Sequence, residues 1–503
     1  MANMIPSYEK ILSLKVKPEE GELHLLNFLD KHLDESFEVY FNPYMNGDRP
    51  DIVVMKRNQG VLIIEVKDYK LEKYELDDRK NWKIKNRTHD YNIKSPISQV
   101  LKYKDNLFEL HIDNLLELKI KDIRNFNMVS CAVYFYNATK KKLNEFLVKP
   151  YEDDKKYMKF LKFKIDLLGR DSLNKNDFTS ILEKRYLISK FASSYFTDKI
   201  YNSFHRFLKP PIHLKEEGKV FNYSPQQLKI IYDDSNIKSK LIKGVVGSGK
   251  TTVLAARAVQ AHKKTGGKVL ILTYNITLKN FIKDKISLIR EKFPWSSFVI
   301  LNYHSFITSE LNNLEIPMVM PLEFKNWSSK KRSDYFEEKY FSNKELFEKV
   351  KDRIKPYDVI LIDEIQDYKR KWMEIIKEFF LVADGEYILF GDVKQNIYSN
   401  KIENKDIVTN IGKRGSTKFL RRCYRSDFKV KDLAIEYQKE IFKDKYELDN
   451  FNKPRDGEIQ YERNQEGHIN YIYLPDTNNI MSLYTIIHEN AINRDVPTND
   501  ITI

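Results

Sequence analysis

The sequence is poor in cysteine and lacks any long apolar run. Only two cysteines, Cys131 and Cys423, occur among 503 residues, and they lie far apart. This scarcity excludes a disulfide framework and a cysteine-type zinc site, and it fits the reducing cytoplasm. No run of about 18 apolar residues is present, and the first 20 residues contain no apolar signal core, so we expect a cytoplasmic protein with no membrane span.

The chain is basic and long enough for several domains. Lysine and arginine number 86 against 72 acidic residues, which gives a formal net charge of +14. Basic proteins often bind polyanions, but a lysine-rich proteome would produce the same excess, so charge alone does not decide. At about 100–200 residues per domain, the length predicts two to four domains.

The order of apolar runs predicts an α/β protein of several domains. An early α/β pattern ends in a charged, helical stretch, and a segment with two prolines and a glycine then breaks the helical pattern. Beyond it, short apolar runs alternate with helices, which indicates a doubly wound parallel sheet. The expected segments are a first domain at 1–208 with its core at about 20–135, a linker at 209–220, a second domain at 221–415 with an insertion at about 307–350, and the start of a further domain at 416–503.

A glycine-rich loop at 244–251 predicts a nucleotide site. It reads GVVGSGKT and follows the pattern G-x-x-x-x-G-K-S/T between an apolar run and a helical one. Its glycines let backbone N–H groups surround phosphate oxygens, Lys250 reaches the outer phosphates and Thr251 can ligate Mg²⁺. A strand–helix turn that binds nothing is the alternative. The expected ATP-binding residues are Gly244, Gly247, Ser248, Gly249, Lys250, Thr251 and Thr252.

Two later strand ends carry polar side chains that suit the same site. VILIDEIQD at 359–367 is an apolar strand ending in carboxylates, where Asp363 is placed to hold Mg²⁺ and Glu364 to deprotonate the attacking water. A solvated acidic strand end would look the same. Gln395, after the strand YILFGD, is placed to sense the γ-phosphate of ATP.

Several motifs in a fixed order resemble those of UvrD/Rep-like superfamily 1 helicases, from about 215 to 430. DEIQD and GDVKQNIY (391–398) resemble two of them, and TYNITLKN (273–280) and YHSF (303–306) resemble segments that touch single-stranded DNA. The resemblance implies a RecA-like motor that binds ATP and DNA. It also assigns three nucleotide contacts: Gln227 in YSPQQ reads adenine, Tyr424 in LRRCYRS stacks on it, and Arg425 contacts the γ-phosphate.

The sequence departs from that family in two places. The T-x-x-x-x-K-G-L-E and V-A-x-T-R-A type segments of the second motor domain are not found before Ile503, so we expect either a shortened chain or an incomplete motor. Ser399, Asn400 and Lys401 also replace the aromatic residue and arginine that often follow the I-Y pair. The resemblance therefore does not carry base stacking over to that position.

Two carboxylates and a lysine in the N-terminal domain suggest a second site. The turn-like KRNQG predicts a hairpin centred near Asn58, and Asp51 and Glu65 lie at equal distances from that centre. They should therefore face each other, with Cβ atoms about 5 Å apart. Lys67 shares the face of Glu65 because strand side chains alternate. Carboxylates this close repel each other unless a cation such as Mg²⁺ lies between them.

This arrangement resembles the PD-(D/E)xK nucleases, and the surroundings resemble the nuclease-related (NERD) domain over about 20–135. Gly21 and Glu22 open a helix, and SPISQ at 95–99 comes later. The resemblance implies a restriction-endonuclease-like fold, metal ligands Asp51 and Glu65 for Mg²⁺ or Mn²⁺, Glu22 as a further acidic site residue and Gln99 as a positioning group. An ordinary surface strand with alternating charge is the alternative.

These features together predict an ATP-dependent nuclease-helicase that acts on single-stranded or double-stranded DNA. Bacterial proteins that join these domain types often look like anti-phage or DNA-repair enzymes. Two other hypotheses remain: an ATP-gated nuclease that does not unwind DNA, and a DNA-binding adaptor without catalysis. The sequence does not distinguish DNA from RNA, and it leaves open a protein partner or a homo-oligomer.

Overall fold

The computed structural model forms two compact units, residues 1–422 and 423–503. It describes residues 1–14, 16–85, 92–392, 402–403, 406–407, 409–411, 415–424, 428–441, 480–491 and 493. The first unit contains both expected α/β domains. The described helices of the second unit are α16 (Phe428–Ile441) and α17 (Ile480–Asn490). Among the helices of these described residues, none is both long and apolar enough to cross a bilayer.

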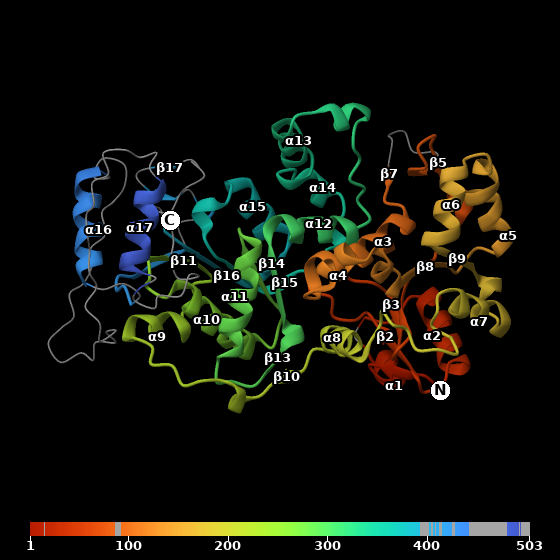
Figure 1. Ribbon diagram of the computed structural model, residues 1–503, viewed down its shortest axis with the longest axis horizontal. Coiled ribbons are helices and arrows are strands. Elements are labelled where there is room, and N and C mark those ends of the chain that lie inside the picture. Colours follow the sequence, from red (N-terminus) through yellow and green to blue (C-terminus); the bar gives the residue numbers. More distant parts are fainter. Residues whose placement is uncertain are drawn as a thin grey trace. The chain divides into compact units, whose positions relative to one another are not determined.

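The N-terminal domain is built on a mixed sheet of six strands (Figure 1). In spatial order these are β1 (Asn3–Ile5), β2 (Phe37–Phe41), β3 (Ile52–Lys56), β4 (Gly60–Lys67), β8 (Val129–Phe135) and β9 (Asp166–Gly169). The β2–β3 and β3–β4 pairs are antiparallel, whereas β1, β8 and β9 join by parallel pairing. β4 therefore lies in the middle of the sheet, with its hairpin partner β3 on one side and its parallel neighbour β8 on the other.

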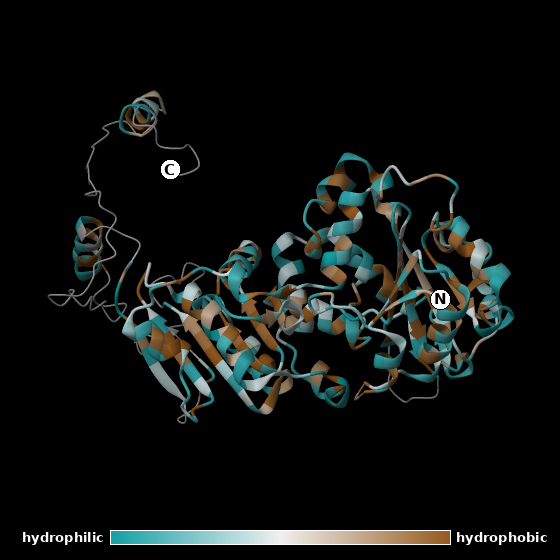
Figure 2. Cartoon of the chain, turned by 90° about the horizontal axis from the view of Figure 1, so that it is seen from below, coloured by the Kyte–Doolittle hydropathy of each residue, from teal (hydrophilic) through white to brown (hydrophobic). Residues whose placement is uncertain are grey.

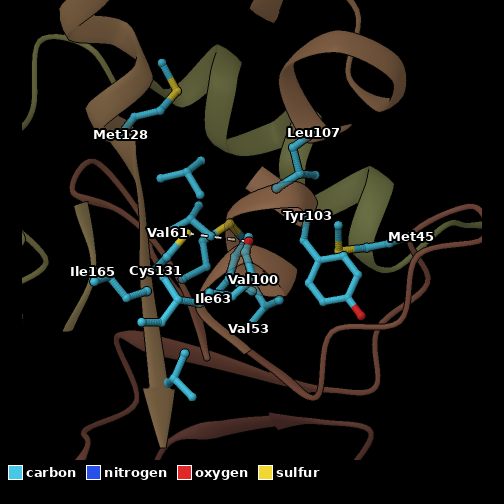
Figure 3. Close-up of a cluster of buried hydrophobic side chains, with 14 of the residues drawn as sticks. Met45, Val53, Val61, Ile63, Val100, Tyr103, Leu107, Met128, Cys131 and Ile165 are labelled. Atoms are coloured by element: carbon cyan, nitrogen blue, oxygen red, sulfur yellow. Dashed lines mark hydrogen bonds between the residues drawn. The ribbon is translucent and has the colours of Figure 1, made fainter. Parts of the chain in front are cut away.

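Each face of this sheet is covered by helices, and alternate residues of β4 serve the two faces. Val61 and Ile63 pack toward α3 (Pro96–Asn106). Cys131 of the neighbouring strand β8 lies on the same face, and its thiol donates to the Val100 carbonyl of α3 at 3.7 Å (Figure 3). Even-numbered residues of β4 pack with α2 (Glu20–His32) on the opposite face. Burial raises the pKa of the Cys131 thiol to about 12, so it is an inert core thiol.

The hairpin register predicted from the sequence is confirmed. The ladder pairs Ile52 with Ile64 and Lys56 with Gly60, which places its centre at Asn58. Asn58 has a φ of +59°, a left-handed conformation that asparagine tolerates better than most residues. The next pair beyond the ladder is Asp51 and Glu65, so the turn residues set the position of both carboxylates.

Gly21 allows α2 to approach the end of β4 closely. Its backbone N–H donates to Asp68 Oδ2 at 3.2 Å. A Cβ atom at Gly21 would collide with the Asp68 carboxylate and would come within 2.9 Å of the Tyr136 Cβ atom and 3.0 Å of a Val66 methyl group. Tyr136 and Val66 contribute atoms close to their own backbones, so they have little room to move.

We expect the substitution Gly21→Ala to destabilise the N-terminal domain by about 1–3 kcal/mol, because an added methyl group has to displace packed atoms. Thermal unfolding followed by circular dichroism measures this as a lower midpoint. Glu20→Ala, on the exposed side of the same helix, is the matched control and should leave the midpoint unchanged. An unaltered midpoint in Gly21→Ala would show that α2 does not lie this close to β4.

The second domain contains the predicted doubly wound parallel sheet. Its strands, in spatial order, are β14 (Phe298–Asn302), β12 (Val269–Thr273), β15 (Tyr357–Ile362), β16 (Leu381–Gly391), β11 (Ser239–Gly244) and β19 (Ser416–Leu420), and every pair is parallel. Figure 2 shows brown, hydrophobic strands within this sheet, and β12, β14 and β15 are buried at nearly every position, as expected when both faces are covered.

Helices cover both faces of the parallel sheet. On one side lie α9 (Pro225–Ile231), α10 (Lys250–Thr265) and α11 (Ile276–Ser287), and on the other α12 (Tyr303–Asn313) and α15 (Arg370–Phe379). β19 begins at the residue where we expected a further domain to start, yet it pairs with β11 of this sheet. The contact boundary lies instead between Arg422 and Cys423.

The remaining segments follow the expected character, with local differences. The stretch after β8 contains four helices and the strand β9, which the charged sequence did not suggest. The linker region contains β10 (Ile212–His213), paired with β13 (Phe293–Pro294). The insertion region includes most of α12, and its later part adds Tyr340 and Phe347 to the core. The helices of these segments are α5 (Lys140–Leu143), α6 (Lys155–Lys164), α7 (Lys175–Lys184), α8 (Asp198–Leu208), α13 (Ser329–Phe336) and α14 (Glu345–Glu348).

Candidate functional site

The N-terminal cluster forms where β3 begins and β4 ends. Asp51 directly precedes β3, and its Oδ2 accepts a hydrogen bond from the Val66 N–H at 2.7 Å. The Asp51 side chain thus continues the hydrogen bonding between β3 and β4 beyond the backbone ladder, and the bond holds the carboxylate beside β4. The Lys67 ammonium donates to Glu65 Oε1 at 2.9 Å, as expected for side chains two residues apart on one strand face.

Burial and mutual repulsion dominate the electrostatics of this cluster. Burial and the charge of Asp51 raise the pKa of Glu65 well above its usual range. Burial also raises the pKa of Asp51, although the nearby Lys67 ammonium opposes the rise. Burial alone would lower the pKa of Lys67, but Glu65 and then Glu315 raise it well above the usual value. Burial and mutual repulsion thus favour the neutral forms of Asp51 and Glu65, whereas the Lys67 ammonium stays charged.

Two oxygen atoms in this cluster are buried without a hydrogen-bond partner. They are Glu65 Oε2 and Gln99 Oε1. Gln99 comes from the first turns of α3, on the sheet face that Glu65 and Lys67 share, and its amide nitrogen lies 3.3 Å from the Tyr103 hydroxyl. Buried carboxylate and amide oxygens normally have partners, so these two fit the hard oxygen ligands that a divalent cation prefers.

Glu22 reaches the same cluster from the first turn of α2. One of its oxygens accepts the Glu19 N–H at 2.8 Å and so caps the helix. Burial raises the pKa of Glu22 to about 7, and the charge of Asp51 adds to the rise. The structure therefore brings Asp51, Glu65 and Lys67 together, with Glu22 near enough to feel the charge of Asp51 and Gln99 linked to them through Tyr103. The described residues nevertheless contain no group of three or more His, Cys, Asp or Glu side chains placed to hold a metal ion.

One residue of this cluster comes from the other domain and was missed by the sequence analysis. Glu315 follows α12, and its Oε1 accepts a hydrogen bond from the Lys67 ammonium at 2.5 Å. Glu315 lies 248 positions along the chain from Lys67, in the region regarded as an insertion. No local pattern in the sequence marks it, because only the packing of the two domains creates the contact.

The two domains meet along a seam formed by residues 44–49 against β14 and α12. The Asn46 side chain donates to the Ile300 carbonyl at 3.1 Å and accepts the Ile300 N–H at 3.0 Å, as a neighbouring strand would. Arg49 pairs with Glu310 at 3.0 Å, where Glu310 is fully buried. Asn313 donates to the Gly47 carbonyl at 2.7 Å. These specific polar contacts join the first domain to the edge of the second sheet.

The glycine-rich loop has the geometry of a phosphate-binding turn. It connects β11 to α10, and Gly247 and Gly249 adopt left-handed φ values of +69° and +79°. Such values are strained for other residues. The Lys250 ammonium is buried and donates to the Gly244 carbonyl at 2.9 Å, and the Ser248 hydroxyl is buried without a partner. The loop thus places a buried ammonium and a hydroxyl without a hydrogen-bond partner at the start of α10, where a helix N-terminus favours anions.

The acidic end of β15 lies beside this loop. Asp363 Oδ2 accepts a hydrogen bond from the Thr251 hydroxyl at 3.1 Å. Burial raises the pKa of Asp363 to about 7, with a further rise from Glu364. Glu364 has a left-handed φ of +52°, a conformation that turns the chain directly after the strand. Thr251 and Asp363 therefore present two oxygens at one place, which fits a Mg²⁺ site.

Two glutamines tie neighbouring elements to these groups. Gln227, at the start of α9, donates to the Ser248 carbonyl at 3.1 Å and so contacts the loop itself. Gln366 donates to Glu364 Oε2 at 2.7 Å and accepts the Asp392 N–H at 3.1 Å. The ends of β15 and β16 are thereby connected. Gln366 was not singled out from the sequence.

Other predicted residues are placed differently or lie outside the description. Thr252 follows Thr251 in the first turn of α10. Gln395 and Arg425 lie outside the described residues, and Tyr424 belongs to the second unit. In the YHSF segment, Tyr303 and Phe306 are buried in the core, so His304 and Ser305 are the partly exposed members.

Sequence comparison assigns both domains to known families. The profile of the nuclease-related domain matches residues 17–136, and the profile of an AAA domain matches residues 227–401. The chain is a fusion of a nuclease-related domain and an AAA domain. The first match ends just after β8, and the second begins at Gln227, so each covers one of the two sites. An AAA domain of this kind binds nucleotides.

Comparison with individual proteins adds little to these family assignments. Among solved structures, the Pif1 helicase from Candida albicans matches with 14% identity over 40% of each chain, with a TM-score of 0.22. The match thus spans 40% of the length of that helicase, and a likeness at this level supports no further argument. None of the curated protein sequences compared with the chain matches it significantly.

Proposed function

We propose that this protein is an ATP-dependent nuclease that acts on DNA, with a motor domain of the helicase type. The observation that carries the nuclease part is the convergence of Asp51, Glu65 and Lys67 where β3 and β4 meet, with Glu65 Oε2 buried and unpartnered. An ordinary surface strand would leave these side chains in water. Burying such a group costs free energy, and a functional site is a common reason to retain it.

Each residue of the nuclease cluster has a distinct task in this proposal. Asp51 and Glu65 hold a divalent cation, and Gln99 provides a further oxygen beside them. A bound Mg²⁺ ion would supply Lewis-acid stabilisation of the charge that develops on the scissile phosphate. Lys67 donates hydrogen bonds to that phosphate and adds a positive charge where the negative charge grows.

The residues of the nucleotide site also have distinct roles in this proposal. The loop amides and Lys250 bind the phosphates of ATP, while Thr251 and Asp363 hold the associated Mg²⁺. Glu364 accepts a proton from the attacking water, and its hydrogen bond to Gln366 orients it. Because Gln366 also accepts the Asp392 N–H, a movement of Glu364 on ATP hydrolysis would be passed to the end of β16.

Cleavage of labelled DNA by the full-length protein tests the function. We expect strand scission in the presence of Mg²⁺ and ATP, and complete inhibition by EDTA. If neither single-stranded nor double-stranded DNA is cut, the nuclease function is rejected and the hypothesis of a DNA-binding adaptor without catalysis is favoured. A strand-displacement assay on the same DNA distinguishes a motor that unwinds from one that only gates the nuclease. Survival of phage-infected cells, with and without the gene, tests the role in phage defence.

We expect the substitution Glu364→Gln to slow ATP hydrolysis by a factor of about 100 to 10,000, because the amide cannot accept the proton from water. ATP binding should persist, since the side chain keeps its shape and the phosphate donors are unchanged. Single-turnover hydrolysis and nucleotide retention on a filter measure both quantities. Hydrolysis near the normal rate would exclude Glu364 as the base.

A further inference from the structure

The Lys67 ammonium of the proposed nuclease site is enclosed by two carboxylates. It donates to Glu65 at 2.9 Å and to Glu315 at 2.5 Å, and its side chain is only 10% exposed. Glu65 belongs to the same strand, but Glu315 belongs to the motor domain. A lysine has three donors, so two of them are already taken by anions.

Glu315 is held in this position from several sides. Its φ of +59° is an uncommon left-handed conformation for glutamate, which persists only where the surroundings determine it. Its carbonyl accepts the Lys94 N–H at 2.7 Å, and its second carboxylate oxygen pairs with Arg353 at 3.2 Å. The contact with Lys67 is therefore built into the domain seam and does not arise from a mobile surface side chain.

This contact conflicts with the binding of a DNA phosphate. The scissile phosphate needs donors of Lys67, and the Glu315 carboxylate occupies one of them. Glu315 also adds a negative charge to a cluster that already contains Glu22, Asp51 and Glu65. A phosphate that approaches Lys67 while Glu315 is in place meets a carboxylate that is already bonded to the ammonium, with only one N–H donor left over.

One helix connects this contact to the nucleotide site. Glu315 lies two residues after α12, whose other end begins with Tyr303. The Tyr303 ring stacks on Trp372 of α15 with centroids 4.4 Å apart. α15 starts just after the segment that carries Asp363 and Glu364. The C-terminal end of α12 also touches the nuclease domain directly, because Asn312 donates to the Gln99 carbonyl at 3.3 Å.

We propose that Glu315 is a latch supplied by the motor domain, which holds Lys67 away from DNA until a movement of α12 releases it. This inference rests on the proposed nuclease function and adds a regulator to that site. In this arrangement ATP and DNA binding by the motor displace α12, and the displacement frees the Lys67 donors. Cutting then depends on the motor without any chemical step shared between the two sites.

The substitution Glu315→Gln tests the latch because it removes the charge and keeps the size of the side chain. We expect cleavage of DNA with Mg²⁺ but without ATP to rise by about tenfold or more, since a hydrogen bond between charged groups is lost. ATP hydrolysis, which uses other residues, should be unchanged and shows that the variant folds. Arg353→Gln, which loosens Glu315 from its outer side, should act in the same direction with a smaller effect. Glu323→Gln, an exposed glutamate of the same region, is the matched control.

Chemical acylation of lysines, mapped by mass spectrometry, gives a readout that does not depend on cleavage. Labelling of Lys67 should rise in Glu315→Gln, and in the unaltered protein after addition of a non-hydrolysable ATP analogue with single-stranded DNA. The exposed Lys330 serves as the internal reference. Unchanged labelling of Lys67 in the variant would overturn the latch.

The outcomes of the two measurements separate this inference from the proposed function. Equal ATP-free cleavage by the unaltered protein and Glu315→Gln would overturn the latch alone. Loss of cleavage in Glu315→Gln would also overturn it, because Glu315 would then position Lys67 for catalysis. Increased labelling without cleavage by either protein would overturn the nuclease function, and the latch with it.

Discussion

The substitution Lys250→Ala is expected to abolish ATP hydrolysis, with a loss of at least about a hundredfold. Lys250 is the cation of the phosphate loop, and its ammonium lies buried next to the Gly244 carbonyl. Once the side chain is shortened, no other described lysine or arginine of the loop can neutralise the outer phosphates. A phosphate-release assay with saturating ATP measures the loss.

The fold of the Lys250→Ala variant should survive. The loop conformation is set by the left-handed glycines at 247 and 249 and by the start of α10, and the side chain contributes one hydrogen bond to a carbonyl. We therefore expect a melting temperature within about 3 °C of the unaltered protein. Lys264→Ala, at the exposed end of the same helix, is the control with full activity. Normal turnover by Lys250→Ala would refute the nucleotide site.

The substitution Glu65→Ala is expected to eliminate DNA cleavage, with a loss on the order of a thousandfold. It removes a proposed metal ligand and leaves Asp51 without the partner that would share a cation. It also leaves the Lys67 ammonium paired with Glu315 alone. A gel assay with end-labelled DNA and Mg²⁺ measures the loss, and Lys67→Ala should have a comparable effect through the missing positive charge.

ATP hydrolysis by Glu65→Ala should continue, because Glu65 takes no part in the nucleotide site. Glu75→Ala, an exposed glutamate of the same domain, is the matched control for cleavage. DNA cleavage by Glu65→Ala at the normal rate would rule out Glu65 as a metal ligand. Cutting by the unaltered protein that EDTA does not stop would instead rule out the metal mechanism and leave the residue assignment to other tests.

The features set by local rules could be predicted from the sequence. The hairpin centre at Asn58 follows from its turn residues, and strand alternation then places Asp51, Glu65 and Lys67 on one face. The phosphate loop follows from its glycine spacing and from the strand and helix on either side. In both cases the geometry depends on residues within about 20 positions, which a linear pattern can describe.

The features that arise from packing at a distance could not be predicted. Glu315 meets Lys67 only because the seam brings α12 against the first domain, and no periodicity indicates this meeting. Likewise, Tyr303 and Phe306 match a segment expected to touch DNA, yet their apolar rings lie in the core of the sheet. The sheet that β19 joins could not be predicted either, because a strand as short as STKFL, with mixed polar and apolar residues, does not reveal its neighbours.

The side chains of Asn46 and Tyr44 cover part of the free edge of the second sheet. β14 is the last strand on that side, and the Asn46 amide satisfies the backbone N–H and carbonyl of Ile300. A fragment released by proteolysis within 209–220 would lose this cover and present an unpaired strand to other molecules. Open strand edges are templates for aggregation. Constructing a soluble isolated motor would therefore require an added polar or charged residue on β14 to replace the cover that the nuclease domain supplies.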